Sequence, residues 1–204
     1  MERLMQWFLP KKKRLFDAKK AKEVDDYFIK ISSLFNLLVQ QDPQFMKAFQ
    51  KDRNTIFYLP QVYVDSIRRI IIRMYSKSDD PISQGYMSSG NLQYALEYVI
   101  QRYNEYPREK AIIKKAAFIF YNIISKHPFS DGNKRSGVIT ANAFMECNGY
   151  TLGELPFRES KEFITAVAEG KKSEKDCERF IKKHARKMDI SDEILKKLKE
   201  MMKK

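Results

Sequence analysis

The segment Ala111–Ile124 constrains the fold more than any other part of the chain. Its apolar side chains fall into two stripes at helical spacing, so most of the surface of the expected helix is apolar. Such a helix needs neighbours on several sides to cover it. We therefore expect it to be central in an all-α, mainly helical fold. The two stripes are Ile112, Ala116, Ile119 and Ile123, and Ile113, Ala117, Phe120 and Ile124.

A second apolar pattern predicts another mostly buried helix further along the chain. It should end near Asn148-Gly149, because glycine just past the last periodic residue commonly closes a helix. The polar residues between the two patterns then form a loop and the start of the second helix. The apolar residues of that helix are Val138, Ile139, Ala141, Phe144 and Met145.

The polar residues between these helices, His127–Gly137, have a composition that no hydrophobic core requires. The first N–H groups of a helix have no intrahelical acceptor and carry the positive end of the helix dipole. The stretch Asp131–Arg135 is therefore expected to bind an anion. Gly132 lets the backbone approach a phosphate group, and the side chains of Lys134 and Arg135 add positive charge.

Three other residues of this stretch have roles that follow from their chemistry. A single carboxylate beside a phosphate site, Asp131, suits Mg²⁺ held jointly by the protein and by nucleotide oxygens. A neutral His127 could take the proton from an attacking hydroxyl. Phe129 is expected to be a hydrophobic anchor. Together these residues predict in-line transfer of a phosphate-containing group to a hydroxyl.

Each of these residues also has a purely structural explanation. A lone histidine before a proline is more often a loop or cap residue than a catalyst, and Asp-Gly-Asn is ordinary turn chemistry. The combination within eleven consecutive residues is far more specific than any one member.

The stretch His127–Arg135, with the sequence HPFSDGNKR, resembles the signature of the Fic/Doc (Fido) family, His-Pro-Phe-x-Asp/Glu-Gly-Asn-Gly/Lys-Arg. Three flanking segments, Gly85–Leu96, Asn148–Leu152 and Phe163–Gly170, are similar to the death-on-curing (Doc) branch of that family. The resemblance covers roughly residues 60 to 187, and the signature is its most specific part.

This resemblance implies a mostly helical domain that uses ATP or a related nucleotide to modify a hydroxyl of a target protein. Family members also carry a short β-hairpin that aligns the target by strand addition. Our candidate for it is Pro81–Asn91, whose Gly and Ser content suits a turn but fits a plain loop equally well. By the family's pattern, His127 is the base, Asp131 the magnesium ligand, and Gly132, Asn133 and Arg135 hold phosphates.

The chain departs from the AMP-transferring members of the family at two positions. Those members usually have Gly at the position of Lys134 and a second Arg at the position of Val138. Lys134 is what the phosphate-transferring Doc type carries, whereas Gly132 follows the AMP-transferring type. We therefore favour phosphate transfer slightly and keep AMP transfer as the alternative.

The sequence Thr165-x-x-x-Glu169-Gly170 matches an inhibitory motif of some Fic proteins, in which the Glu pairs with the second Arg. That Arg is missing here, and an ordinary amphipathic helix closed by Gly170 explains the pattern as well. We expect inhibition, if the protein is a toxin, to come from a separate antitoxin protein.

The main feature of the composition is a strong positive charge. The net charge is +13, from 39 Lys and Arg against 26 Asp and Glu, and such a balance can attract nucleic acid or ribosomes. The basic residues are scattered rather than interleaved with aromatics on one face, so we do not expect a nucleic-acid partner. His184 is expected at the surface.

No apolar stretch has the length of a membrane span, and residues 1–10 lack the features of a cleaved signal. The two cysteines, Cys147 and Cys177, have no metal-binding spacing and agree with a reducing compartment. These observations predict a cytoplasmic protein with no membrane partner.

Helical spacing also predicts one or two helices within Asp17–Gln50 and a helix that starts near Leu59 with Arg68, Arg69 and Arg73 on its wetter face. Further helices are expected before Pro107, over Ser160–Glu169 and over Ser173–Lys187. We divide the chain into an N-terminal helical extension (1–55), a Fido catalytic domain (56–190) and a basic C-terminal helix (191–204).

Two other classes of function compete with the enzyme. The net charge would fit a basic protein that binds nucleic acid or ribosomes. A Fido domain without activity could serve as an interaction module, but all residues needed for the base, metal and phosphate roles are present.

Overall fold

The computed structural model describes residues 56–75, 83, 85–153 and 155–187. Apart from residue 187, these belong to one compact unit. The helices expected within residues 17–50 and 191–204 lie outside the described residues, and the division into three parts stays a prediction.

The described part is mostly helical, which confirms the predicted all-α class. Two helix starts have a local cause: the Ser88 side chain accepts a hydrogen bond from the backbone N–H of Asn91, and Ser173 and Asp176 form a reciprocal capping box. The elements are α4 (Gln61–Tyr75), α5 (Ser89–Gln101), α6 (Arg108–Ser125), α7 (Asn133–Cys147), β1 (Tyr150–Leu152), α8 (Phe157–Ala168), α9 (Glu174–His184) and β2 (Ala185–Lys187).

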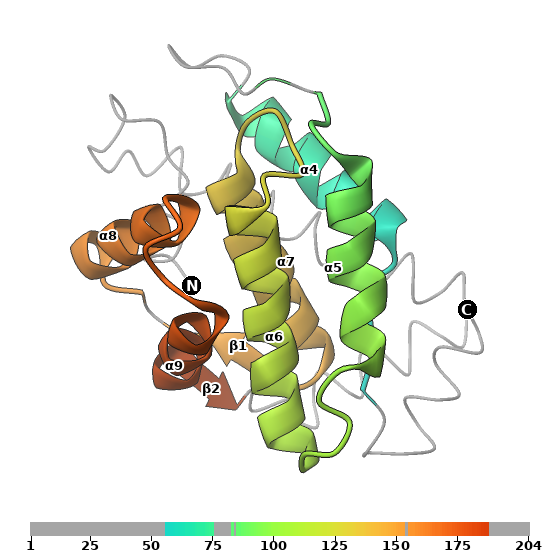
Figure 1. The fold of residues 1–204 in the computed structure, drawn as a ribbon, viewed down its shortest axis with the longest axis vertical. Coiled ribbons are helices and arrows are strands. Elements are labelled where there is room, and N and C mark those ends of the chain that lie inside the picture. Colours follow the sequence, from blue (N-terminus) through green and yellow to red (C-terminus); the bar gives the residue numbers. More distant parts are fainter. Residues whose placement is uncertain (1–55, 76–82, 84, 154, 188–204) are drawn as a thin grey trace, which may run out of the picture. The chain divides into compact units, whose positions relative to one another are not determined.

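Helix α6 is the centre of this unit, as its two apolar stripes predict. It contacts α5, α7, α8 and α9, and it runs between α5 on one side and α8 with α9 on the other (Figure 1). Both stripes are buried: all eight of their residues are at most 8% exposed. Because α6 is covered on several sides, its C-terminal end provides a fixed starting point for the polar loop that follows.

Helix α7 approaches α6 closely at Gly137. A Cβ atom at this position would lie 2.5 Å from Cγ1 of Ile124 and 3.3 Å from the carbonyl oxygen of Phe120. Only a residue without a side chain therefore allows this spacing of the two helices. The contact lies one turn from the start of α7, so it also fixes where the polar loop ends.

Lys115 is a fully buried cation on α6, and it closes the end of α5. Its ammonium group donates hydrogen bonds to the carbonyl oxygens of Val99 (2.8 Å) and Ile100 (3.2 Å), to that of Arg102, and to Oδ1 of Asn104 (2.9 Å). Burial lowers its pKa to about 8, so the group is still mostly protonated at neutral pH. Lys115 thus satisfies carbonyl groups that a helix end leaves without partners.

The chain beyond α8 differs from the sequence prediction in two ways. The last described helix ends at His184 rather than at Lys187, because residues 185–187 pair as β2 with β1. His184 is buried, at 5% exposure, with its ring tilted against Phe180, so the prediction that it lies at the surface is wrong.

Only part of the expected β-hairpin, Pro81–Asn91, lies within the described residues. Among the described residues of this stretch, Tyr86 forms an isolated antiparallel bridge with Phe129, and α5 already begins at Ser89. The two-stranded sheet, β1 with β2, involves other residues.

The described residues bear on two expectations from composition, those about the cysteines and about membrane-spanning segments. Cys147 and Cys177 are both buried free thiols, and burial raises the pKa of Cys177 to about 12. None of the described helices combines the length and the apolar character needed to cross a lipid bilayer.

We predict that Gly137→Ala destabilises the protein, because the added methyl group would overlap Ile124. The expected loss is about 1–2 kcal/mol, since overpacking outweighs the higher helix propensity of alanine. Gly90→Ala is the matched control: Gly90 also lies in a helix, but the nearest atom to its added Cβ is Oγ of Ser88 at 3.9 Å. Urea denaturation measures the free energy of unfolding of both variants. If Gly137→Ala were as stable as Gly90→Ala, the close approach of α7 to α6 would be contradicted.

We also predict that Lys115→Met costs about 3 kcal/mol, because the carbonyl groups at the end of α5 would lose their buried donor. Lys110→Met, on the exposed first turn of the same helix, should change the free energy of unfolding by less than about 0.5 kcal/mol. Equal midpoints for the two variants in thermal unfolding would show that Lys115 does not stabilise the end of α5.

Candidate functional site

The polar loop spans residues 126–132, between the end of α6 and the start of α7. Its backbone is left-handed at two positions, His127 (φ 45°) and Gly132 (φ 72°). A left-handed conformation is common for glycine but carries a steric cost for histidine. The loop therefore depends on side-chain contacts that hold it in this shape.

Asn133, the first residue of α7, provides the main contact of this kind. Its Oδ1 accepts a hydrogen bond from the backbone N–H of Phe129 (2.9 Å), and its Nδ2 donates to the carbonyl oxygen of Phe129 (2.8 Å). The Asn133 side chain is 7% exposed, so these bonds are shielded from water. One amide thus ties the middle of the loop to the start of the helix.

Phe129 anchors the loop from the other side. It is 1% exposed, with its ring centroid 5.3 Å from that of Tyr86 and the guanidinium carbon of Arg68 4.4 Å from its centroid. The ring thus has an aromatic neighbour from the segment before α5 and a cation from α4.

The segment Gly85–Ser88 runs antiparallel to the loop and is hydrogen-bonded to it. The N–H groups of Met87 and Ser88 donate to the carbonyl oxygen of Pro128 (2.9 and 3.1 Å), and the N–H of Ser130 donates to the carbonyl oxygen of Gly85 (3.0 Å). In this pattern Tyr86 and Phe129 are a non-hydrogen-bonded pair, so the backbone N–H and C=O of Tyr86 point away from the loop. The far edge of this short segment is therefore directed outward.

The residues predicted to bind phosphate and metal lie at the start of α7. Asp131 is half-buried, and its Oδ1 accepts from the backbone N–H of Gly132. Arg135 is half-buried, whereas Lys134 is exposed, with its ammonium nitrogen 3.5 Å from Oγ1 of Thr165 on α8. The structure thus brings one carboxylate, two cations and the first N–H groups of a helix into one stretch of five residues.

Among the described residues, no cluster of three or more His, Cys, Asp or Glu side chains could hold a metal ion. The sequence predicts another kind of site, in which Asp131 would be one protein ligand of Mg²⁺ and nucleotide oxygens would supply others. A single half-buried carboxylate beside a helix N-terminus fits that arrangement.

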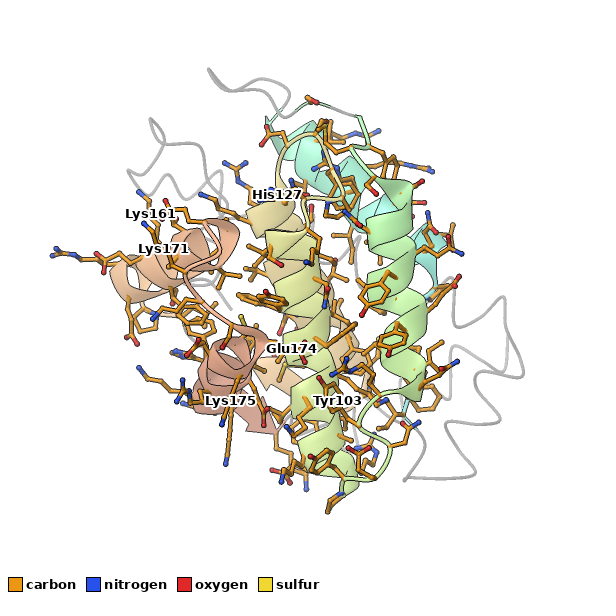
Figure 2. All side chains as sticks on the ribbon, in the orientation of Figure 1. Tyr103, His127, Lys161, Lys171, Glu174 and Lys175 are labelled. Carbon is orange, nitrogen blue, oxygen red and sulfur yellow. The ribbon has the colours of Figure 1, made fainter. Side chains whose placement is uncertain are left out.

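His127 is an exposed residue of the loop, and its ring faces the end of α8. Its Nε2 is 3.3 Å from the carbonyl oxygen of Ala168, and its Nδ1 is 3.5 Å from Nδ2 of Asn133. Since the two bonds to Phe129 orient the Asn133 amide, Nδ1 faces a donor, and the ring proton is assigned to Nε2. Figure 2 shows His127 at one end of the helical unit and Tyr103 with Glu174 towards the other.

The last turn of α8 and the residues after it border the site. Glu169 forms an ion pair with Lys171 (2.7 Å), and hydrogen bonding and charge from Lys171, with a smaller contribution from Lys134, lower the pKa of the Glu169 carboxyl. Val138, at the position of the family's second Arg, is 1% exposed. A groove of about 560 Å³ follows this face of α8; its lining residues are Arg158, Lys161, Glu162, Thr165, Ala166, Glu169 and Lys171.

Sequence reasoning missed one residue that contacts the site, Arg68. The helical pattern placed it with Arg69 and Arg73 on the wetter face of α4, but it is 4% exposed and the other two are exposed. It lies against the ring of Phe129 instead. No signal in the sequence distinguishes these arginines, because the difference depends on the position of the loop.

We predict that Asn133→Ala lowers the free energy of unfolding by about 2–3 kcal/mol, because it leaves the buried N–H and C=O of Phe129 without partners. Lys134→Ala, one residue along and exposed, should cost no more than about 0.5 kcal/mol. Chemical denaturation of both variants measures the difference. A loss no greater for Asn133→Ala than for Lys134→Ala would mean that the amide does not hold the loop.

Comparison with known protein families gives a match that includes the polar loop. Residues 54–145 match the model of the Fic/DOC family, and this stretch includes α4, α5, α6, the polar loop and nearly all of α7. No curated protein and no solved structure matches the sequence. The family match, with the helical architecture around the loop, supports a Fic/DOC (Fido) domain in this part of the chain.

Proposed function

We propose that this protein is a transferase that moves a phosphate-containing group from ATP, or another nucleoside triphosphate, to a Ser, Thr or Tyr hydroxyl of a target protein. Phosphate transfer is our first choice of reaction. The observation that carries the proposal is the placement of an exposed imidazole, His127, and a half-buried carboxylate, Asp131, on one short loop that leads into the start of α7.

The start of α7 supports the nucleotide part of the proposal. The first N–H groups of the helix and the side chains of Lys134 and Arg135 would bind the phosphates, and Gly132 and Asn133 would shape the backbone around them. Asp131 would hold Mg²⁺, which would offset the charge of the phosphates when bound. These contacts matter most as negative charge moves towards the leaving group in the transition state.

His127 would act as the general base. The target hydroxyl gives its proton to the imidazole, its oxygen forms a bond to phosphorus, and the bond between phosphorus and the bridging oxygen breaks. The electron pair of that bond leaves with the nucleotide product: ADP if the γ phosphate of ATP is attacked, or pyrophosphate if the α phosphate is attacked. To accept a proton at Nε2, the ring must first leave the Ala168 carbonyl and carry its own proton on Nδ1.

The segment Gly85–Ser88 would align the target. The backbone groups of Tyr86 point away from the loop, so an extended segment of the target could add there as a further strand. His127 directly precedes Pro128, whose carbonyl oxygen accepts from Met87 and Ser88. A target hydroxyl carried by such a strand would therefore be close to the proposed base.

Three residues bear on the choice between phosphate and AMP transfer. Lys134 follows the phosphate-transferring pattern, and the buried Val138 replaces the second Arg of the AMP-transferring pattern. Gly132 favours AMP transfer by resemblance, which makes that reaction the second candidate. Its φ of 72°, however, is a backbone reason for glycine that does not depend on the donor group.

We further propose that a separate antitoxin, rather than α8, regulates a toxic activity in the cytoplasm. Glu169 pairs with Lys171, an interaction that differs from the Glu–Arg pair of self-inhibited family members. Val138, which replaces the second Arg, is buried and has no charge with which Glu169 could pair.

We predict that the purified protein, mixed with ATP, Mg²⁺ and a lysate of its host cells, transfers label from γ-labelled ATP but not from α-labelled ATP to a protein. His127→Ala should reduce the labelling by a factor of about 10² or more, because the base is lost. Lys126→Ala, the neighbouring exposed residue, is the matched control and should label like the wild type. Transfer from the α position would mean AMP transfer.

Absence of label on any protein, or equal labelling by His127→Ala and the wild type, would contradict the proposed function. Thermal unfolding of the three proteins must accompany the assay, so that a loss of labelling is not a loss of folded protein.

A further inference from the structure

Arg68 is a buried cation that the fold does not explain. Its side chain is 4% exposed, whereas Arg69 and Arg73 on the same helix are exposed. Removal of a charged group from water carries a large cost unless the group is well paired. Two of its three guanidinium nitrogens, Nε and Nη1, are buried without a hydrogen-bond partner in the described part of the chain.

The third nitrogen has a specific contact next to the site. Nη2 of Arg68 donates to the carbonyl oxygen of Ser83 (2.7 Å), and the hydroxyl of Ser83 is hydrogen-bonded to that of Ser130 in the polar loop. The flat guanidinium group also lies over the ring of Phe129, at 4.4 Å. One side chain of α4 thus contacts both the loop and Ser83, which comes shortly before the segment that pairs with the loop.

Charges of the site act in turn on Arg68. Burial lowers the pKa of this guanidinium, and the neighbouring Asp131 carboxylate and Tyr86 oppose that shift. Tyr86 is held in turn by a hydrogen bond from its hydroxyl to Asp65, which is also on α4. Helix α4 therefore fixes the segment before α5 at two points, the carbonyl group of Ser83 and the ring of Tyr86.

An apolar side chain of similar length would fill the same space without the cost of a buried charge, as is found when buried ionic groups are replaced in other proteins. Retention of a costly group at a site is typical of residues that serve activity rather than stability. The contacts of Arg68 with Ser83 and Phe129 indicate what that role is.

We infer that Arg68 is a positioning residue of the proposed transfer reaction, which holds Ser83 and the segment Gly85–Ser88 against the polar loop so that the target strand lies in register with His127. The inference rests on the proposed function. It assigns to α4 a part in target alignment and none in nucleotide binding, so the two effects can be measured separately.

The test compares Arg68→Met, Arg68→Lys and the adjacent exposed control Arg69→Met. Hydrogen exchange reports directly on the alignment, because the amides of Met87, Ser88 and Ser130 form the bonds between segment and loop. In Arg68→Met these amides should exchange about tenfold faster or more, while amides within α6 keep their rates. The exchange rates of these amides in Arg68→Lys should lie between those of Arg68→Met and the wild type. In Arg69→Met they should equal those of the wild type.

Two further readouts separate positioning from a structural role. Arg68→Met should unfold at the same temperature as the wild type or higher, because it removes an incompletely paired buried charge. Labelling of lysate proteins by γ-labelled ATP should fall about tenfold at low lysate concentration and recover in part at high concentration, as expected for weaker target alignment. Calorimetric binding of ATP with Mg²⁺ should change by less than about threefold.

The inference is wrong if Arg68→Met accelerates exchange equally throughout the unit with a lower unfolding temperature, which is the result for a general structural contact. It is also wrong if the exchange of Met87, Ser88 and Ser130 is unchanged. If the wild type labels nothing, the proposed function fails, and the exchange rates still decide whether Arg68 holds the segment against the loop.

Discussion

The close approach of α7 to α6 at Gly137 is the constraint on which the rest of the structure depends. Because no side chain separates the helices there, the end of α6 and the start of α7 are brought close together, and residues 126–132 must turn sharply between them. The left-handed backbone of His127 and Gly132 is part of that turn. The shape of the polar loop is thus a consequence of core packing, and the Asn133 amide stabilises it.

Charge is distributed around the loop in two layers. Lys134 and Arg135 lie at the start of α7, where a phosphate could reach them together with the helix N–H groups. Arg68 lies beneath, against the ring of Phe129, where it is almost inaccessible to solvent. The outer cations suit a ligand, and the inner cation suits the placement of neighbouring backbone. The two kinds of cation therefore differ in their access to a ligand beside the half-buried carboxylate of Asp131.

Helical periodicity predicted the described helices well, because each buries a continuous apolar face. The two stripes of α6 and the pattern that begins at Val138 can be found in the sequence without knowing which elements pack against them. Residue chemistry and family resemblance predicted the loop, since its residues are adjacent in sequence. Burial of Arg68 and His184 was missed, because it depends on neighbours that approach in three dimensions. The end of α9 was also misplaced, since residues 185–187 pair with β1, more than thirty residues earlier.

The most direct test of the central claim is whether ATP binds at the start of α7. Amide chemical shifts measured by NMR during titration with ATP and Mg²⁺ report on each backbone N–H separately. We expect the largest shifts at Gly132, Asn133, Lys134 and Arg135, and we expect full-size shifts only when both ATP and Mg²⁺ are present. Binding of ATP at the start of α7 would be contradicted if the amide signals of these four residues did not move, or if the largest shifts occurred elsewhere in the unit.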